Sequence, residues 1–290
     1  LGSYEGFHSG TFYQDRTDVF FRKEIPALDT ASFITGVRFG YVDDRIDAST
    51  QKEQTVWGGE LAYLFQTEFG SLGLRIDRAF RYATLDENNP GSFNLISDIL
   101  KPQIGDTLSA TIENADVSAR IYYSRLENEL IYDSPALANV NLDQTSRYGI
   151  DGSLIFFQSD SLTIKSTLRW INTKIESGTF NGKKVPGAPN LSGGLKIESR
   201  LTDRQTLMLS GIYVSSSYPW SDFDNSLGKT NAYTTASASW SYAQDGFRGV
   251  LKINNLFDRT YNAYEIDSFS GHAITPAEPI NFEFGVSYEF

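Results

Sequence analysis

Cysteine is missing from this chain of 290 residues, and histidine occurs only twice, as His8 and His272. The first absence excludes disulfide bonds, thiolate metal sites and cysteine nucleophiles. The second excludes a zinc centre built from three histidines of this chain. Basic residues are also few, because 25 Lys and Arg stand against 36 Asp and Glu, for a net charge of −11. A general nucleic-acid binder needs a basic face to neutralise phosphates, so we expect no nucleic-acid partner.

Long hydrophobic runs are missing too. No apolar stretch approaches the roughly 18 residues that a membrane-spanning helix needs, so a helical membrane protein is excluded. Residues 1–10 also lack the basic start and the apolar stretch of a secretory signal. The sequence therefore predicts either a chain whose signal has been removed or a segment of something larger.

Apolar and polar residues instead alternate with a period of two along most of the chain. In the last eleven residues, every second position from Ile280 to Phe290 is apolar, and polar or small residues lie between them. This pattern is typical of a β-strand with one apolar and one wet face. It predicts about thirteen strands, at 6–21, 32–43, 54–66, 70–82, 106–114, 116–132, 145–157, 160–175, 190–201, 205–217, 230–243, 246–257 and 280–290.

The lengths of these strands and the charges on them favour a transmembrane β-barrel. Strands of a soluble sandwich have about 5–6 residues, whereas a membrane-spanning strand needs roughly 9–11. Charge that faces lipid costs roughly 2–4 kcal/mol at the midplane, so the charged face is expected to be the lumen. Lumen-facing side chains would then include Arg120, Arg169, Lys196, Lys252 and Glu283. The lipid-facing side chains would include Leu168, Trp170, Ile197, Leu251 and Phe284.

The connections between the predicted strands give an independent indication. Short turns alternate with long loops, as in outer-membrane barrels, which have short periplasmic turns and long extracellular loops. The connection at 22–31 falls where a short turn is expected, but it is longer than the other short turns. Aromatic residues near strand ends, such as Trp57, Trp170 and Trp240, are typical of girdles at the lipid–water interfaces. A large soluble all-β domain is the alternative. The long loops are expected at 44–53, 83–105, 133–144, 176–189, 218–229 and 258–279.

Several segments resemble motifs of the TonB-dependent outer-membrane receptors. Asn255-Leu256-Phe257-Asp258, followed by Tyr261 and a closing strand that ends in Phe290, is similar to the C-terminal segment of that family. The other segments, in family order, are Gly36-Val37-Arg38-Phe39, Phe80-Arg81-Tyr82-Ala83-Thr84-Leu85-Asp86-Glu87, Leu100-Lys101-Pro102-Gln103, Tyr148-Gly149-Ile150-Asp151 and Val185-Pro186-Gly187-Ala188-Pro189. Ala83 and Gln103 depart from the family pattern, which has Pro and Glu there.

The resemblance implies an all-β, antiparallel up-and-down barrel of about 22 strands with a plug domain in its lumen. Residues 1–290 would form the C-terminal part of that barrel, because nothing in them resembles the plug or the TonB box. An odd number of strands with a periplasmic C-terminus would place Leu1 outside the cell. The implied function is TonB-dependent uptake of a scarce ligand such as a ferric siderophore, without enzymatic chemistry and without a resident cofactor. Implied partners are the TonB–ExbB–ExbD complex, outer-membrane lipid and lipopolysaccharide, and the barrel assembly machinery.

Ligand sites of such receptors lie on the plug, the lumen wall and the extracellular loops. Trp220 is the most interesting candidate, because an aromatic loop residue can stack on a planar ligand, although packing within the loops is the simpler role. Asp222 and Asp224 could hold Ca²⁺, although solvated loop acids are the simpler reading. The closing strand, with Phe284, Val286, Tyr288 and Phe290, is similar to the signal read by the assembly machinery. The candidate ligand-binding residues are Tyr82, Tyr132, Tyr218, Trp220, Tyr264 and His272.

Other functions remain as alternatives at this point. A free-standing porin of about 12 or 14 strands fits the size of the chain but not the family motifs. An outer-membrane phospholipase needs a Ser–His pair with a third polar group, and neither histidine has a recognisable partner. A haem receptor is disfavoured because the segment directly after Phe80-Arg81 contains no histidine. Siderophores, cobalamin, sugars and peptides all remain possible ligands.

Overall fold

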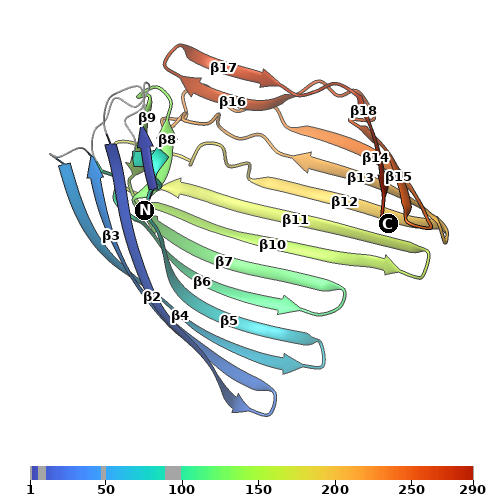
Figure 1. Cartoon of the computed structure of the whole chain (residues 1–290), viewed down its shortest axis with the longest axis horizontal. Coiled ribbons are helices and arrows are strands. Elements are labelled where there is room, and N and C mark those ends of the chain that lie inside the picture. Colours follow the sequence, from blue (N-terminus) through green and yellow to red (C-terminus); the bar gives the residue numbers. More distant parts are fainter. Residues whose placement is uncertain (1, 6–10, 47–49, 89–98, 290) are drawn as a thin grey trace.

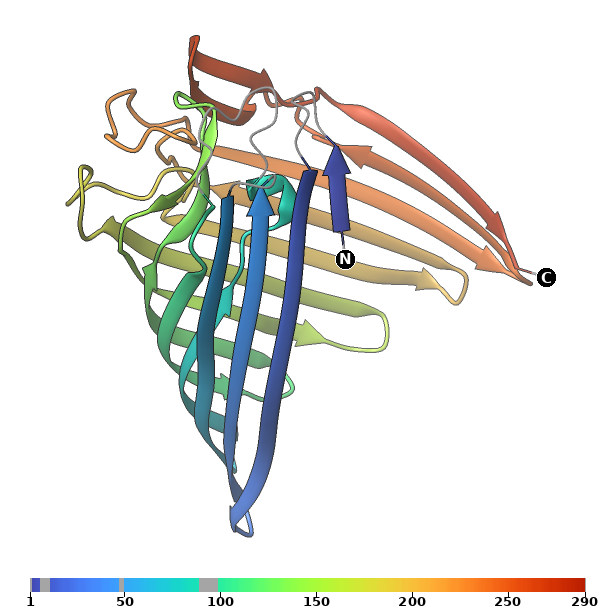
Figure 2. The same cartoon turned by 60° about the vertical axis from the view of Figure 1, so that its left-hand side comes forward.

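The structure, a computed structural model, describes residues 2–5, 11–46, 50–88 and 99–289. Fourteen of its strands form one antiparallel sheet, which curves strongly (Figures 1 and 2). No helix in the described part is long and apolar enough to cross a membrane. The strands of the sheet are, in spatial order, β1 (Gly2–Glu5), β2 (Thr11–Leu28), β3 (Ala31–Ile46), β4 (Thr50–Thr67), β5 (Gly70–Arg81), β6 (Gln103–Glu113), β7 (Val117–Glu127), β10 (Thr145–Gln158), β11 (Leu162–Ile175), β12 (Leu191–Thr202), β13 (Gln205–Val214), β14 (Tyr233–Gln244), β15 (Phe247–Asn254) and β18 (Asn281–Tyr288).

Each strand pairs with its predecessor in the chain, except where a hairpin is inserted. The hairpin of β8 (Glu129–Asp133) and β9 (Ala138–Leu142) lies between β7 and β10, and that of β16 (Asn262–Ser268) and β17 (Gly271–Pro276) lies between β15 and β18. Tight turns gather at one end of the sheet, and the loops and hairpins lie at the other (Figure 1). At the tight turn before β5, Gly70 has a φ of +129°, and an added Cβ would lie 2.4 Å from the carbonyl oxygen of Glu113. Glycine is therefore required at this turn.

The thirteen predicted strands are confirmed within the described residues, residues 6–10 of the first lie outside them, and β1 is a strand that the alternation did not indicate. Two loop predictions were wrong. The segment 22–31 is strand up to Leu28, and β3 begins at Ala31. Pro26 lies next to a register shift of the ladder, a position where a strand tolerates proline. The segment 44–53 is also mostly strand, because Gln51 pairs across to Arg45 and its amide donates to Asp43. Residues 47–49 lie outside the described part.

The other long loops contain structure that the alternation did not show. The predicted strand 116–132 is interrupted at Asn128, whose φ of +54° ends β7 and starts the β8–β9 hairpin. The short helix α1 (Leu85–Asn88) lies within 83–105, and the β16–β17 hairpin lies within 258–279. The loop end of the sheet is therefore built from ordered hairpins and turns.

The register separates the two faces of the sheet as the sequence predicted. Asp151 lies opposite both Arg120 and Arg169, and its carboxylate oxygens are 2.7 Å and 3.7 Å from their guanidinium nitrogens. Lys252 lies opposite Glu283, at 3.1 Å. Following the pairing from strand to strand places all five predicted lumen charges on this polar face and the five predicted lipid residues on the other.

The clusters of buried apolar residues lie at the loop end of the sheet. One cluster joins Leu142, Ile175, Val185 and Phe223, with Ile131 and Phe180 packed against it. Another joins Val42, Val56 and Tyr82. Along the sheet, by contrast, large apolar side chains such as Leu168 and Phe284 are exposed. The apolar surface of the sheet thus needs a nonaqueous environment, and the loop end has its own core.

Candidate ligand site at the loop end

The backbone of Trp220 is anchored to the β16–β17 hairpin. Its N–H donates to the carbonyl oxygen of Glu265 at 2.9 Å, and its carbonyl oxygen accepts from the N–H of Asp267 at 2.7 Å. These two bonds form an isolated parallel bridge with Ile266. The next residue, Ser221, has a φ of +63°. The Trp220 backbone is therefore held like a short strand added to the hairpin, although it lies in a loop.

The ring of Trp220 lines a cavity of about 260 Å³. The ring packs against Gly187, where an added Cβ would lie 2.5 Å from the indole, and stacks on Tyr264 at a centroid distance of 6.3 Å. Other walls of the cavity come from the β8–β9 hairpin, the loop at 185–189 and the polar face of β10–β12. They include Glu129, Ile131, Arg147, Arg169, Ile171, Pro186, Pro189 and Ser192.

Two arginines give this cavity a charged wall. Arg147 is ion-paired with Glu129, which also accepts a hydrogen bond from the Thr145 hydroxyl at 2.8 Å. Arg169 is freer: its side chain is 60% exposed and lies 3.7 Å from the Asp151 carboxylate. An exposed guanidinium and an indole that line the same cavity can together bind a ligand that is both planar and anionic.

A second hollow, of about 530 Å³, continues along the polar face and shares both arginines with the first. Its walls add Arg75, Arg120 and Tyr122, from β5 and β7. Each of those arginines has an acidic partner: Arg75 contacts Glu60 and Asp77, and Arg120 contacts Asp151. The loop cavity therefore opens onto a wall of arginines and carboxylates.

Asp222 and Asp224 shape the loop that carries Trp220. The fully buried carboxylate of Asp222 accepts the backbone N–H of Ser226 at 2.8 Å and that of Leu227 at 3.3 Å. Burial raises the pKa of Asp222, whereas the hydrogen bond from Ser226 lowers the pKa of Asp224. No group of three or more His, Asp or Glu in the described part is placed to hold a metal ion. Ca²⁺ binding by the two aspartates stays a prediction.

Hydrogen bonds connect the Trp220 loop with two further segments. The Ser221 hydroxyl donates to the carbonyl oxygen of Tyr132 at 2.9 Å and accepts the N–H of Ser134 at 3.2 Å. The side chain of Asn225 exchanges two hydrogen bonds with the backbone of Lys184. Together with the buried cluster around Phe223, these bonds make the loop end one connected unit.

Five of the six predicted ligand residues belong to this unit. Trp220 lines the cavity and Tyr264 stacks behind it, whereas Tyr132 and Tyr218 contribute carbonyl oxygens to the contacts between loops. His272 lies on β17, 3.0 Å from Glu265. Tyr82 lies apart, at the end of β5. It is buried against Phe80 and the guanidinium of Arg16, and burial raises its pKa.

Sequence reasoning missed Glu129, Arg147 and Arg169 as parts of the site. Arg169 was predicted to face the lumen, but its place in the wall of the cavity that Trp220 lines depends on which strand ends meet under which loop. The prediction could have been improved by counting residues from Arg169 to the strand end. That count would place the arginine near the loops.

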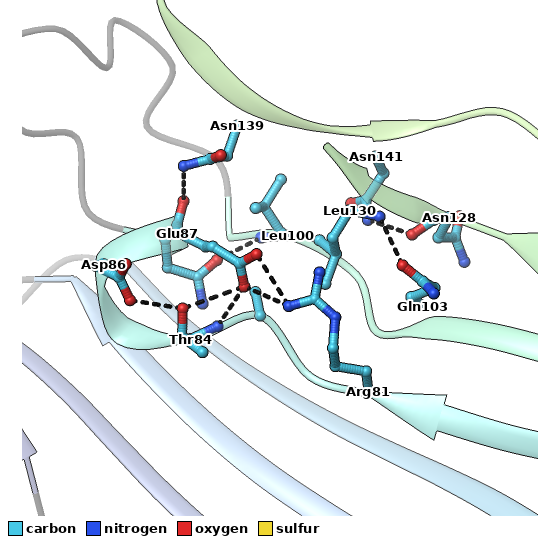
Figure 3. A network of polar contacts seen from close by, with 12 residues as sticks. Arg81, Thr84, Asp86, Glu87, Leu100, Gln103, Asn128, Leu130, Asn139 and Asn141 are labelled. Carbon is cyan, nitrogen blue, oxygen red and sulfur yellow. Dashed lines mark hydrogen bonds and ion pairs between the residues drawn. The ribbon is translucent and has the colours of Figure 1, made fainter. Parts of the chain in front are cut away.

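Polar contacts around α1 explain the roles of residues in the Phe80–Glu87 and Leu100–Gln103 motifs (Figure 3). Glu87 accepts the backbone N–H of Thr84 at 2.8 Å, as in a capping box at the start of α1, and is also ion-paired with Arg81 at 2.8 Å. Gln103, which stands in place of the usual Glu, accepts the backbone N–H of Leu130. Ala83 is buried. This segment thus holds the β8–β9 hairpin against the end of β5 and β6.

The curved antiparallel sheet has one charged face and one exposed apolar face, with tight turns at one end and structured loops at the other. These features together define the wall of a transmembrane β-barrel. The family model described as TonB dependent receptor-like, beta-barrel matches residues 2–256. The chain therefore belongs to the β-barrel family of TonB-dependent receptors, as the motifs indicated. Barrels of this family lie in the bacterial outer membrane, and its members are receptors and transporters rather than enzymes.

Solved structures show the same fold. The siderophore receptor PiuA from Acinetobacter baumannii is 16% identical, with a TM-score of 0.77, over 96% of this chain and 44% of its own. The ferric yersiniabactin uptake receptor FyuA from Yersinia pestis is 17% identical, with a TM-score of 0.77, over 97% of this chain and 46% of its own. The copper transporter OprC is 13% identical, with a TM-score of 0.77. The chain spans less than half the length of each of these proteins.

Proposed function

We propose that these residues form the C-terminal part of the barrel of an outer-membrane receptor that takes up a ferric siderophore in a TonB-dependent manner. The observation that carries the proposal is the cavity at the loop end, which is lined both by Trp220 and by the largely exposed Arg169. Ferric siderophores combine planar groups with negative charge, and both features suit this pair. The names of the PiuA and FyuA receptors support the ligand class.

Energy for uptake would come from the TonB–ExbB–ExbD complex, acting on a plug domain in the completed barrel. The loops would face the outside of the cell, and the tight turns and the C-terminus would face the periplasm. A passive porin is not favoured, because the family match covers most of the chain. We also assign to β18 the role of assembly signal. Phe284, Val286 and Tyr288 share its exposed apolar face, and Phe290 lies outside the described residues.

Ligand binding by the purified full-length receptor tests this proposal. A panel of ferric siderophores is titrated against the parent protein and against the variants Trp220→Ala and Arg169→Gln. Arg169→Gln should weaken the binding of the cognate siderophore by about 10-fold or more, because a hydrogen bond to a charged group contributes about 1.5–3 kcal/mol. Trp220→Ala should weaken it by about 3-fold or more, because stacking contributes about 0.5–1.5 kcal/mol beyond the buried area. Lys196→Gln, on the same face but outside the cavity, should bind as the parent does. Unchanged affinity in both cavity variants would refute the site.

A further inference from the structure

Glu129 places a carboxylate in the wall of the cavity that Trp220 lines. It is the first residue of β8 and directly follows Asn128, whose φ of +54° turns the chain into the β8–β9 hairpin. The backbone N–H of the next residue, Leu130, donates to the side chain of Gln103 at 3.0 Å. The backbone at Glu129 is therefore fixed, and the acid belongs to the ordered part of the loop end.

Both oxygens of this carboxylate accept hydrogen bonds from β10. Oε1 accepts from the guanidinium of Arg147, and Oε2 accepts from the hydroxyl of Thr145 at 2.8 Å. Thr145 is fully buried, and the side chains of Glu129 and Arg147 are only 12% and 23% exposed. The acid thus holds the guanidinium of Arg147 in an internal ion pair within the cavity wall.

Arg169 is the more exposed of the two cations that line the cavity. It shares the carboxylate of Asp151 with Arg120, which lies nearer, at 2.7 Å against 3.7 Å. Of the described residues, those that line the cavity with a charged side chain are Glu129, Arg147 and Arg169. The lining therefore has one positive charge in excess, and it would have two if Glu129 were neutral.

The volume of the cavity limits how much of a ligand it can hold. About 260 Å³ is available, whereas a site for a complete small-molecule ligand typically has roughly 300–1,000 Å³. The cavity would therefore receive one group of a ferric siderophore, and the rest of the chelate would lie in the adjoining hollow of about 530 Å³. A group with a single negative charge matches the excess charge of the lining. Further negative charge would be repelled by the carboxylate of Glu129.

We propose that Glu129 determines the charge of the ferric siderophores that this receptor accepts. The inference rests on the proposed function and adds a substrate class to it, namely chelates with one net negative charge or none. Tricatecholate complexes carry three negative charges, so the ion-paired wall disfavours them. Neutralising Glu129 would free Arg147 for the ligand and shift the preference toward the tricatecholates. A purely structural role of Glu129 would affect ligands of different charge alike.

Titration of the purified full-length receptor with three iron(III) complexes tests the inference. The complexes are a trihydroxamate with no net charge, a phenolate–carboxylate chelate with one negative charge and a tricatecholate with three. The variant Glu129→Gln removes the charge but keeps an oxygen that can accept from Thr145 or Arg147. Glu198→Gln is the matched control, because Glu198 is paired with Lys196 at 2.9 Å on the same face outside the cavity.

Two further variants separate charge from structure. The double variant Glu129→Gln and Arg147→Gln has the same cavity charge as the parent, so it should return to the preference of the parent. Arg147→Gln alone leaves Glu129 unpaired, and it should weaken the binding of the singly charged chelate relative to the neutral one. Heat-modifiable migration in gels checks folding, and Arg147→Gln carries the test if Glu129→Gln does not fold.

The parent should bind the neutral or the singly charged complex more tightly than the tricatecholate. Glu129→Gln should raise the affinity for the tricatecholate, relative to the better of the other two, by about 10-fold or more, because it removes a repulsion and frees a cation. Glu198→Gln should leave this ratio as it is in the parent.

A parent that prefers the tricatecholate would overturn the inference, as would equal ratios in Glu129→Gln and in the parent, or equal shifts in Glu129→Gln and Glu198→Gln. Each of these results leaves the receptor role in place, because a ferric siderophore is still bound. If the parent binds none of the three complexes, the substrate class is wrong, and the wider panel of ferric siderophores decides the proposed function separately.

Discussion

At the scale of single residues, the Trp220 site depends on a glycine that gives the indole its space. Gly187 has a φ of +68°, and an added Cβ would lie 2.5 Å from the Trp220 ring. Its N–H also donates to the carbonyl oxygen of Tyr218 at 2.9 Å. The Val-Pro-Gly-Ala-Pro turn therefore fixes both the backbone before Trp220 and the face of its ring. This explains why a turn motif lies beside the candidate ligand site.

Replacement of Gly187 by alanine should release the Trp220 loop. The left-handed backbone costs about 1–2 kcal/mol for a residue with a side chain, and the clash with the indole adds to this. We expect the amides of Trp220 and Asp267 to exchange hydrogen at least 10-fold faster. Gly182→Ala is the control, because Gly182 also has a positive φ, +87°, but an added Cβ there meets nothing within 4 Å. If both variants change exchange at Trp220 equally, the ring contact has no role in positioning it.

At the scale of elements, the strands could be predicted from the sequence, whereas the hairpins in the loops could not. Strands such as β18 have a strict alternation of apolar and polar residues, because one face meets lipid and the other meets water or charge. The β8–β9 and β16–β17 hairpins are packed by other loops, so their residues, such as Ala138 and Ile266, show no such pattern. Strand ends beyond the membrane also lose the alternation. For this reason β2, β3 and β4 extend further than predicted.

The loops and the tight turns should lie on opposite sides of the membrane. Ser226 is exposed in the Trp220 loop, and Thr202 is exposed at the turn between β12 and β13. A cysteine at Ser226 should react with a membrane-impermeant maleimide on intact cells, because Ser226 is exposed and these 290 residues contain no other cysteine to compete. A cysteine at Thr202 should react only after the outer membrane is permeabilised. The reverse pattern would contradict the orientation.

At the scale of the whole molecule, the two faces of the sheet define its environment. Ion pairs such as Arg120–Asp151 and Lys252–Glu283 are spread across the polar face, whereas Leu168, Trp170 and Phe284 are exposed on the other. The sequence alone predicted this division, since side chains of a strand alternate between faces. It could not predict the loop cavity, because the cavity forms where segments from five parts of the chain meet.

Two neighbouring residues of β11 test the assignment of the faces. Leu168→Arg should destabilise the full-length receptor in lipid bilayers by about 2–4 kcal/mol, because it places a charge in the hydrocarbon. Thr167→Arg, one residue earlier, places the same side chain on the polar face and should cost less than half as much. The free energy of unfolding of each variant is measured by folding it into vesicles at graded urea concentrations. The folded fraction is read from heat-modifiable migration in gels. A larger loss for Thr167→Arg would show that the faces are reversed.

Energised uptake is the most direct test of the central claim that the chain is the wall of a TonB-dependent siderophore receptor. Cells that express the full-length receptor as their sole siderophore receptor are supplied with iron-55 loaded on a panel of siderophores, with and without functional TonB. We expect at least one ferric siderophore to be accumulated in the presence of TonB, and accumulation to fall to the receptor-free background when TonB is absent. Accumulation that is the same with and without TonB, or absent for every ferric siderophore tested, would contradict the account.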